Sequence, residues 1–176
     1  QQIKIFFFFF LREYWDVKQF NLGFNNIYGY AIYDSLNSFL LGQNAVYRTT
    51  NSGDSWFEQF TSPYRLNEIK FFNNNGLILC DSGNYYKSTD KGNSWSLYNV
   101  SNTINNLLSV SYTNENEIRI GGEGGSVFTT SNSGNNWYSN SSNFIKSNLG
   151  SIEIIDSTIF IVGESGKILK STNDGI

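Results

Sequence analysis

The chain has 176 residues, one Cys, no His and a formal net charge of −3, and 17% of its residues are aromatic. This length suits one ordinary domain, and the apolar content excludes an intrinsically disordered chain. The scattered Lys and Arg residues lack the clustering that phosphate binding requires, which argues against a nucleic-acid partner. The absence of His excludes Ser–His and Cys–His catalytic pairs.

Residues 1–14 form an apolar N-terminal segment in which Lys4 is followed by seven apolar residues, Ile5 to Leu11. This order resembles the first two regions of a secretory signal, and it equally fits a buried strand. Both interpretations stay open. The run is too short to cross a bilayer as a helix. A signal remnant would place the protein outside the cytoplasm, as an extracellular, cell-surface or periplasmic protein.

Residues 15–176 repeat with a period near forty residues, which is typical of repeat architectures. The four Trp residues are 41, 39 and 42 residues apart, and the Gly residues of four similar turns are 39, 42 and 41 apart. The repeat units cover residues 27–56, 66–95, 108–137 and 149–176.

Short apolar stretches alternate with polar turns inside each unit. In the third unit we predict strands at Leu108–Tyr112, Ile118–Gly121 and Ser126–Thr130, joined by turns at Thr113–Glu117 and Glu123–Gly125. The Trp then opens a fourth short strand. Because no helical periodicity exceeds two turns, the sequence predicts an all-β fold, a β-propeller of four-stranded antiparallel blades.

Each third strand leads into the pattern Ser/Thr-x-Asx-x-Gly-x-x-Trp. The Asx side chain can accept backbone N–H groups of the following residues, and Gly tolerates the positive φ of a tight turn. The Trp on the next strand can cover this turn and pack between blades. The predicted structural residues are Thr49, Asn51, Gly53, Trp56, Ser88, Asp90, Gly92, Trp95, Thr130, Asn132, Gly134, Trp137, Ser171, Asn173 and Gly175.

This motif resembles the Asp-box, or BNR, repeat. The stretch "VGESGKILKSTNDG" is similar to repeats of photosystem II assembly-factor-like propellers and of secreted bacterial Asp-box proteins. The resemblance covers residues 27–176 and implies a β-propeller. Only Asp90 is an Asp, and the other three boxes carry Asn, which removes the charge that calcium binding favours. We therefore expect no metal and no cofactor.

The number of blades allows two interpretations. The Trp15 strand at the N-terminus matches the strand that the last unit lacks, so pairing between them would close a ring of about four blades. The alternative is that the chain is a fragment of a larger ring. An incomplete ring would also allow a homodimer.

Three acids are the candidate binding residues, because they occupy equivalent places between the second and third strands of their units. They are Asp81, Glu123 and Glu164, and Gln43 takes this place in the first unit. A ring of acids could bind a cation or a sugar, and the same position also suits a polar residue that opens a turn. Exposed tyrosines such as Tyr28, Tyr30, Tyr64 and Tyr98 could contact a protein or a glycan, or serve only as strand residues.

These observations favour a non-enzymatic interaction or scaffold module with a protein or glycan partner. Sialidases also use Asp-box propellers, so a carbohydrate-binding protein or glycoside hydrolase is an alternative, although Arg12, Arg48, Arg65 and Arg119 do not cluster in the sequence. The family resemblance adds an assembly factor for a membrane complex, such as a photosystem, as a second alternative. We expect Cys80, in an apolar run, to be a buried structural thiol.

Overall fold

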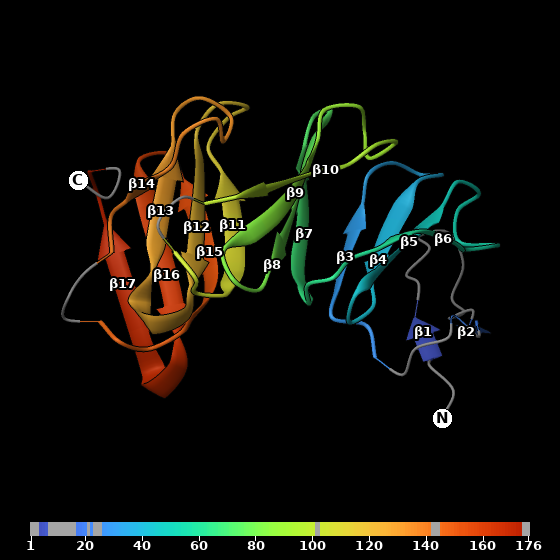
Figure 1. Cartoon of the computed structure of the whole chain (residues 1–176), viewed down its shortest axis with the longest axis horizontal. Coiled ribbons are helices and arrows are strands. Elements are labelled where there is room, and N and C mark those ends of the chain that lie inside the picture. Colours follow the sequence, from blue (N-terminus) through green and yellow to red (C-terminus); the bar gives the residue numbers. More distant parts are fainter. Residues whose placement is uncertain are drawn as a thin grey trace.

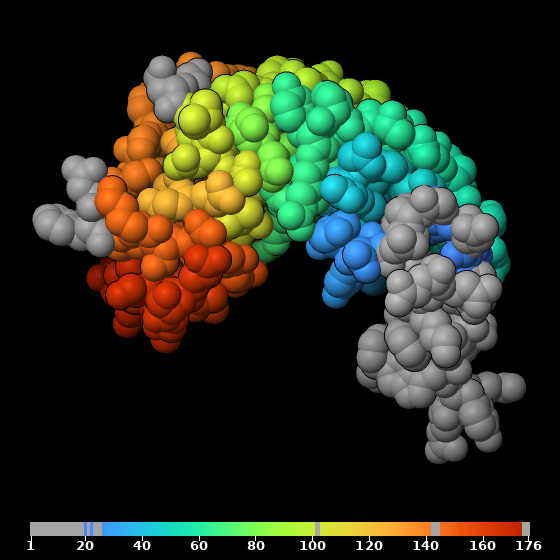
Figure 2. Space-filling model, turned by 60° about the horizontal axis from the view of Figure 1, so that its bottom comes forward, coloured from blue at the N-terminus to red at the C-terminus, as the bar shows by residue number. Residues whose placement is uncertain are grey.

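A computed structural model describes residues 4–6, 17–20, 22, 26–100, 103–141 and 145–173. In these ranges, antiparallel sheets stand side by side along an open arc, and the described N-terminal and C-terminal sheets lie at its opposite ends (Figures 1 and 2). The structure is a partial β-propeller, which confirms the predicted all-β class. The described ranges contain no helix with the length and apolar character needed to cross a membrane.

Each repeat unit forms one blade. Blade 1 contains β3 (Gly29–Ile32), β4 (Ser38–Leu41), β5 (Ala45–Thr49) and β6 (Phe57–Thr61). Blade 2 contains β7 (Leu66–Phe72), β8 (Asn75–Cys80), β9 (Asn84–Ser88) and β10 (Ser96–Asn99). Blade 3 contains β11 (Leu107–Tyr112), β12 (Ile118–Gly122), β13 (Val127–Thr130) and β14 (Tyr138–Ser139). Blade 4 contains β15 (Leu149–Ile155), β16 (Thr158–Gly163) and β17 (Lys167–Ser171).

The second and third strands of blades 3 and 4 are joined by short 3-10 turns, η1 (Glu123–Gly125) and η2 (Glu164–Gly166). The first strands of successive blades, β3, β7, β11 and β15, lie next to one another at the inner side of the arc. Each strand pairs with the next along the chain, so every blade is a meander. As a result, the same pair of sheet faces meets at each boundary between blades.

The strands that the structure describes do not form a closed four-bladed ring. The N-terminal β2 (Val17–Gln19) pairs with β1 (Lys4–Phe6) in a sheet of its own, and the described part of blade 4 ends at β17. Trp15 and Gly175 lie outside the described residues, as do the side chains of the apolar segment. The expected interpretation of residues 1–14 as a signal remnant or buried strand therefore stays a prediction, apart from the strand at β1.

The hydrophobic core lies between blades, because alternate residues of each strand face the preceding and the following blade. At the first boundary, Phe39, Leu41 and Val46 of blade 1 pack against Ile69 and Tyr86 of blade 2. Each buried side chain of this size contributes about 1.5–3 kcal/mol relative to exposure. The same packing recurs at the next two boundaries.

Cys80 is fully buried in the first of these boundary cores and is a free thiol. Burial raises the pKa of Cys80 to about 12, so the side chain stays a neutral thiol. It packs as a small apolar residue there.

Candidate functional site

The turn with the pattern Ser/Thr-x-Asx-x-Gly joins the third and fourth strands of a blade, and we call it the corner of that blade. The corners of blades 1, 2 and 3 are closed by one set of hydrogen bonds. In blade 2, the Gly92 N–H donates to the Ser88 Oγ at 2.8 Å, and the Ser88 hydroxyl donates to the Asp90 Oδ1 at 2.8 Å. The Ser94 N–H then donates to the same Asp90 oxygen at 2.9 Å. The last contact is the one the sequence pattern predicts; the Ser hydroxyl that links both turn residues was not anticipated.

The same bonds recur where the repeat recurs. In blade 1 the Gly53 N–H donates to Thr49 Oγ1 at 2.9 Å, and in blade 3 the Gly134 N–H donates to Thr130 Oγ1 at 3.0 Å. Gly53, Gly92 and Gly134 all have positive φ, between 75° and 84°. A left-handed backbone at this place is why Gly recurs there.

The corners of blades 2 and 3 dock on the preceding blade. At the first boundary the Trp95 ring lies edge-on to Phe39 of blade 1, with centroids 6.2 Å apart. The Gly92 carbonyl accepts hydrogen bonds from Gln59 Nε2 at 2.6 Å and from Arg48 Nη1 at 3.4 Å. The Arg48 guanidinium also donates to Asn93 Oδ1 at 2.7 Å. The third and fourth strands of blade 1 therefore hold the corner of blade 2.

The second boundary uses other side chains for the same task. Trp137 Nε1 donates to the Tyr85 hydroxyl at 3.1 Å, and that hydroxyl donates to the Gly134 carbonyl at 2.9 Å. Lys87, at the position of Arg48, donates to the Ser133 carbonyl at 2.5 Å. Burial raises the pKa of Tyr85 and lowers the pKa of Lys87.

A groove of about 410 Å³ opens at this second boundary, between β10 and the corner of blade 3. We call it the aromatic groove. Its lining consists of Tyr85, Lys87, Tyr98, Asn99, Gly134, Asn135, Asn136, Trp137 and Tyr138. Tyr98 and Tyr138 are 48% and 62% exposed, so two aromatic faces are available to a ligand beside several amide groups.

One substitution between repeats explains why the groove lies at this boundary. Gln59 in blade 1 and Tyr98 in blade 2 each stand three residues after their Trp. Gln59 reaches the corner of blade 2 and bonds its carbonyls. Tyr98 instead stacks on Tyr85, with ring centroids 5.6 Å apart. Because Tyr98 stacks on Tyr85, it leaves the outer side of the blade 3 corner uncovered. The two stacked Tyr rings form part of the lining of the groove.

A second hollow, of about 150 Å³, lies between blades 3 and 4. Apolar side chains such as Val127, Ile152 and Ile159 line most of it, with Arg119 and Lys170 at its border. Arg119 occupies in blade 3 the position of Phe39 in blade 1, because Arg119 pairs with Thr129 as Phe39 pairs with Arg48. The hollow therefore occupies the place where Trp95 contacts Phe39 at the first boundary.

The three predicted acids do not come together in one site. Asp81 Oδ1 accepts a hydrogen bond from Asn67 at 2.9 Å, Glu123 Oε1 from Asn106 at 2.9 Å, and Glu164 Oε1 from Asn148 at 3.1 Å. Each acid thus bonds an Asn near the first strand of its own blade. Within the described ranges, no cluster of three His, Cys, Asp or Glu residues is arranged to hold a metal ion.

All three Asn residues also connect neighbouring blades, and Asn67 Nδ2 does so by donating to the Leu107 carbonyl of blade 3 at 2.9 Å. The Asn106 side-chain oxygen accepts the Ser82 N–H of blade 2 at 2.9 Å, and the Asn148 oxygen accepts the Gly124 N–H of blade 3 at 3.1 Å. The acid, the Asn and the preceding turn form one chain of hydrogen bonds. This geometry favours the interpretation of the acids as turn residues that position the Asn side chains.

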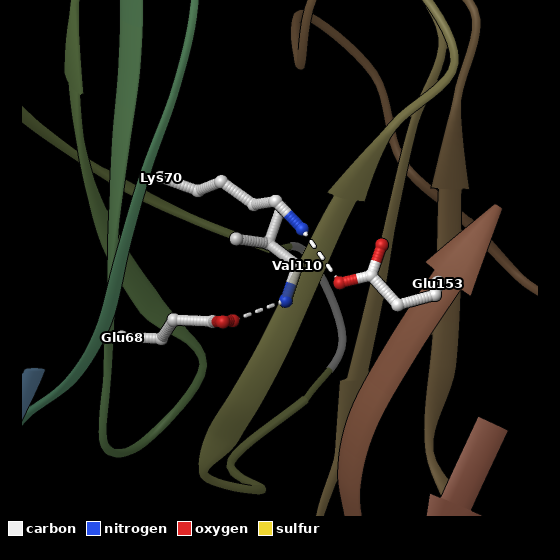
Figure 3. Close-up of polar contacts among 4 residues, drawn as sticks. All are labelled: Glu68, Lys70, Val110 and Glu153. Carbon is white, nitrogen blue, oxygen red and sulfur yellow. Dashed lines mark hydrogen bonds and ion pairs between the residues drawn. The ribbon is translucent and has the colours of Figure 1, made fainter. Parts of the chain in front are cut away.

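A partly buried carboxylate that the sequence did not reveal lies on the inner strands (Figure 3). Glu68 of β7 accepts the backbone N–H of Val110 on β11, at the inner edge where β11 has no strand neighbour. Burial raises the pKa of Glu68 to about 7. Nearby, Lys70 and Glu153 form an ion pair at 3.1 Å that joins blades 2 and 4. In the sequence Glu68 resembles any polar strand residue.

The three arginines that the structure describes lie apart. Arg48 holds the corner of blade 2, Arg65 lies over the Tyr28 ring at 4.8 Å, and Arg119 is buried and donates to Thr113 Oγ1. They do not converge on a carboxylate-binding pocket, and Arg12 lies outside the described residues.

Of the four singled-out tyrosines, only Tyr98 lines the aromatic groove. Tyr28 and Tyr30 are exposed at the first blade, and Tyr64 packs against the core between blades 1 and 2. Sequence reasoning missed Trp137 and Tyr138 as groove residues. The aromatic pair directly after the corner was the only signal that could have indicated them.

The repeats are similar in sequence to those of known proteins. Residues 96–172, from β10 to β17, match the family model described as photosynthesis system II assembly factor YCF48. The chain is 28% identical over 113 residues to the chloroplastic photosystem II stability/assembly factor HCF136 of Oryza sativa subsp. japonica, a match that covers 59% of this chain and 27% of that protein.

Solved structures agree on the fold. The structure of YCF48 bound to D1 peptide superimposes with a TM-score of 0.68 at 20% identity, covering 82% of this chain and 49% of that one. An ancestral GH74 enzyme gives 0.70 at 21% identity, covering 86% of this chain and 23% of that one. The chain thus spans about half of the YCF48 structure and about a quarter of HCF136. The chain is built of BNR-type β-propeller repeats.

Proposed function

We propose that this chain is a non-enzymatic β-propeller module that binds a peptide segment of a partner protein and assists assembly of a membrane complex. The aromatic groove is the observation that carries the proposal. It combines two exposed Tyr rings, Asn amides and Lys87, which suit the apolar side chains, backbone groups and carboxylates of an extended peptide.

The comparisons support a protein ligand. The family model, named for an assembly factor, spans the groove's outer strand β10 and its corner. The related YCF48 structure is of a complex with D1 peptide. A peptide bound between β10 and β14 would lie along outer blade edges, whose backbone groups can add hydrogen bonds to side-chain contacts.

The non-enzymatic part of the proposal rests on the site residues. The chain has no His, and the three acids at equivalent turns bond Asn side chains that connect blades. Two carboxylates facing each other across a cleft, as hydrolysis of a glycoside requires, are not assembled from these acids. The proposal also keeps the module outside the cytoplasm, as the N-terminal pattern suggests.

Fluorescence anisotropy with labelled D1 peptide tests this function. We expect saturable binding that Tyr138→Ala weakens about tenfold, because an exposed aromatic anchor contributes about 1–2 kcal/mol. Leu97→Ala is the matched control, since Leu97 is exposed on the same boundary strand but does not line the groove. Equal binding by both variants, or no binding by the native chain, would overturn the proposal.

A sugar is the second candidate ligand, and the same groove favours it. Pyranose rings stack on exposed Tyr faces, and Asn amides bond hydroxyl groups. A glycan array with the native chain and with Tyr138→Ala distinguishes this candidate. Array binding that Tyr138→Ala abolishes, together with no affinity for D1 peptide, would replace the peptide with a glycan.

A further inference from the structure

The face of blade 4 that points away from blade 3 repeats the surface with which blade 1 receives blade 2. By strand register, Phe160, Val162 and Ile168 occupy the positions of Phe39, Leu41 and Val46 in blade 1. The three blade 1 residues are fully buried under blade 2. Their counterparts in blade 4 are 41%, 44% and 71% exposed.

The polar part of this receiving surface is repeated as well. In blade 1 the Arg48 guanidinium lies over the Phe39 ring at 5.2 Å and donates to the corner of blade 2. In blade 4 the Lys170 ammonium lies over the Phe160 ring at 5.6 Å. The cation and ring that hold the corner of blade 2 on blade 1 are therefore arranged in the same way, but exposed, on blade 4.

The opposite end of the arc carries the matching open surface. In blade 1, Tyr30 and Ile32 occupy the positions of Ile69 and Phe71 in blade 2, which pack against blade 1. Tyr30 and Ile32 are exposed. The outer part of this face is already covered, since Phe20, Leu22 and Ile27 pack on Leu40, Ala45 and Tyr47.

We infer that the exposed face of blade 4 binds blade 1 of a second copy of this chain, head to tail. Ile32 of the second copy would contact Phe160 as Phe71 contacts Phe39, whose rings are 5.0 Å apart. Lys170 would reach the Gly53 corner of the second copy as Arg48 reaches Gly92. The two faces lie at opposite ends of the open arc, so the described blades do not bring them together (Figure 2).

Sedimentation velocity from about 1 to 100 µM tests this contact over the range in which weak interfaces associate. The native chain is expected to shift from one to two chains with rising concentration. Ile168→Lys and Ile32→Lys should each raise the dissociation constant roughly tenfold or more, since each puts a charge into an apolar contact. Ile104→Lys is the control, because Ile104 is 86% exposed and belongs to neither face.

Mixing the two variants identifies the head-to-tail arrangement. The intact blade 4 face of Ile32→Lys can bind the intact blade 1 face of Ile168→Lys, so association should return in the mixture. A native chain that stays monomeric, dimers unaffected by either variant, or a mixture without recovery would each overturn the inference. These residues lie outside the aromatic groove, so peptide binding and self-association can fail independently.

Discussion

Trp137 and Tyr85 are joined across the boundary between blades 2 and 3. The indole N–H donates to the Tyr85 hydroxyl at 3.1 Å, and this hydroxyl donates in turn to the Gly134 carbonyl at 2.9 Å. Tyr85 is almost fully buried, so water does not replace either partner. One hydroxyl thereby fixes the Trp and the turn of one blade to the strand of another.

Tyr85→Phe removes that hydroxyl. The buried Gly134 carbonyl then loses its donor, and the partly buried Trp137 indole N–H loses its acceptor. We expect the free energy of unfolding to fall by about 1–3 kcal/mol, the usual cost of an unsatisfied buried polar group. Urea denaturation followed by Trp fluorescence measures the change. Tyr98→Phe is the control, because the Tyr98 ring is half-exposed. Equal effects of the two variants would show that the hydroxyl contributes little.

The Ser88 hydroxyl organises the corner of blade 2 and can be tested by one pair of variants. Ser88→Ala loses the acceptor of the Gly92 N–H, so we expect a loss of about 1–2 kcal/mol, as for a helix-capping hydroxyl. Ser88→Thr should be close to neutral, because Thr49 and Thr130 make the same bonds in blades 1 and 3. If Ser88→Thr destabilises as much as Ser88→Ala, the hydroxyl is not the cause.

Gly92 combines a positive φ of 75° with a close approach to blade 1. A Cβ added there would lie 2.4 Å from the Phe39 Cζ atom. Gly92→Ala therefore adds backbone strain and a clash with a fully buried ring, and we expect a loss of about 3 kcal/mol or more. Gly150→Ala is the matched control, since a Cβ there meets nothing within 4 Å. A near-neutral Gly92→Ala in thermal denaturation would contradict this packing.

Glu68 predicts a pH dependence of stability with a definite sign. Because burial raises its pKa to about 7, from 4.5, the folded state holds the proton more tightly than the unfolded chain. The stabilisation is complete below pH 4.5 and is lost as pH rises through 7. The loss amounts to about 3 kcal/mol at most by pH 8.

Glu68→Gln keeps an oxygen that can accept the Val110 N–H and removes the titration. The difference in unfolding free energy between native and variant chains should therefore change between pH 5 and pH 8, with the variant relatively more stable at pH 8. Paired denaturant titrations at the two pH values measure it. A difference that stays constant with pH would show that Glu68 does not titrate in this window.

Much of the fold could be predicted because each repeat is marked by turn residues that lie close together in the sequence. In the third unit the predicted strands Leu108–Tyr112 and Ile118–Gly121 match β11 and β12 to within one residue. The turn at Glu123–Gly125 is η1. The residues that fix each hairpin lie close together in the sequence, as Ser88, Asp90 and Gly92 do, so periodicity alone locates it.

The contacts between blades could not be predicted, because they depend on which side chains meet across boundaries. Arg48 and Lys87 occupy equivalent places in their repeats, and no pattern in the sequence shows that both donate to the corner of the next blade. Glu68 looked like an ordinary polar strand residue until β11 was placed beside it. The aromatic groove arises from Tyr98 stacking on Tyr85, a contact between residues thirteen apart that no local pattern encodes.

The predicted pairing of the N-terminal strand with blade 4 is not found in the structure, for a related reason. The N-terminal Trp strand had the right pattern for the missing strand of blade 4, and pattern carries no information about which of two edges a strand will join. In the structure β2 pairs with the nearby β1. A local partner costs less loop-closure entropy than a distant one.

The most direct test of the central claim is a titration of the ¹⁵N-labelled chain with D1 peptide, followed by amide and indole N–H resonances. We predict saturable shifts confined to the aromatic groove, at Lys87, Tyr98, Asn135 and Tyr138 and at the Trp137 indole N–H, with Trp56 and Trp95 unchanged. Shifts at the turns of Asp81, Glu123 and Glu164 without any in the groove, or no shifts at all, would contradict a peptide-binding function for this site.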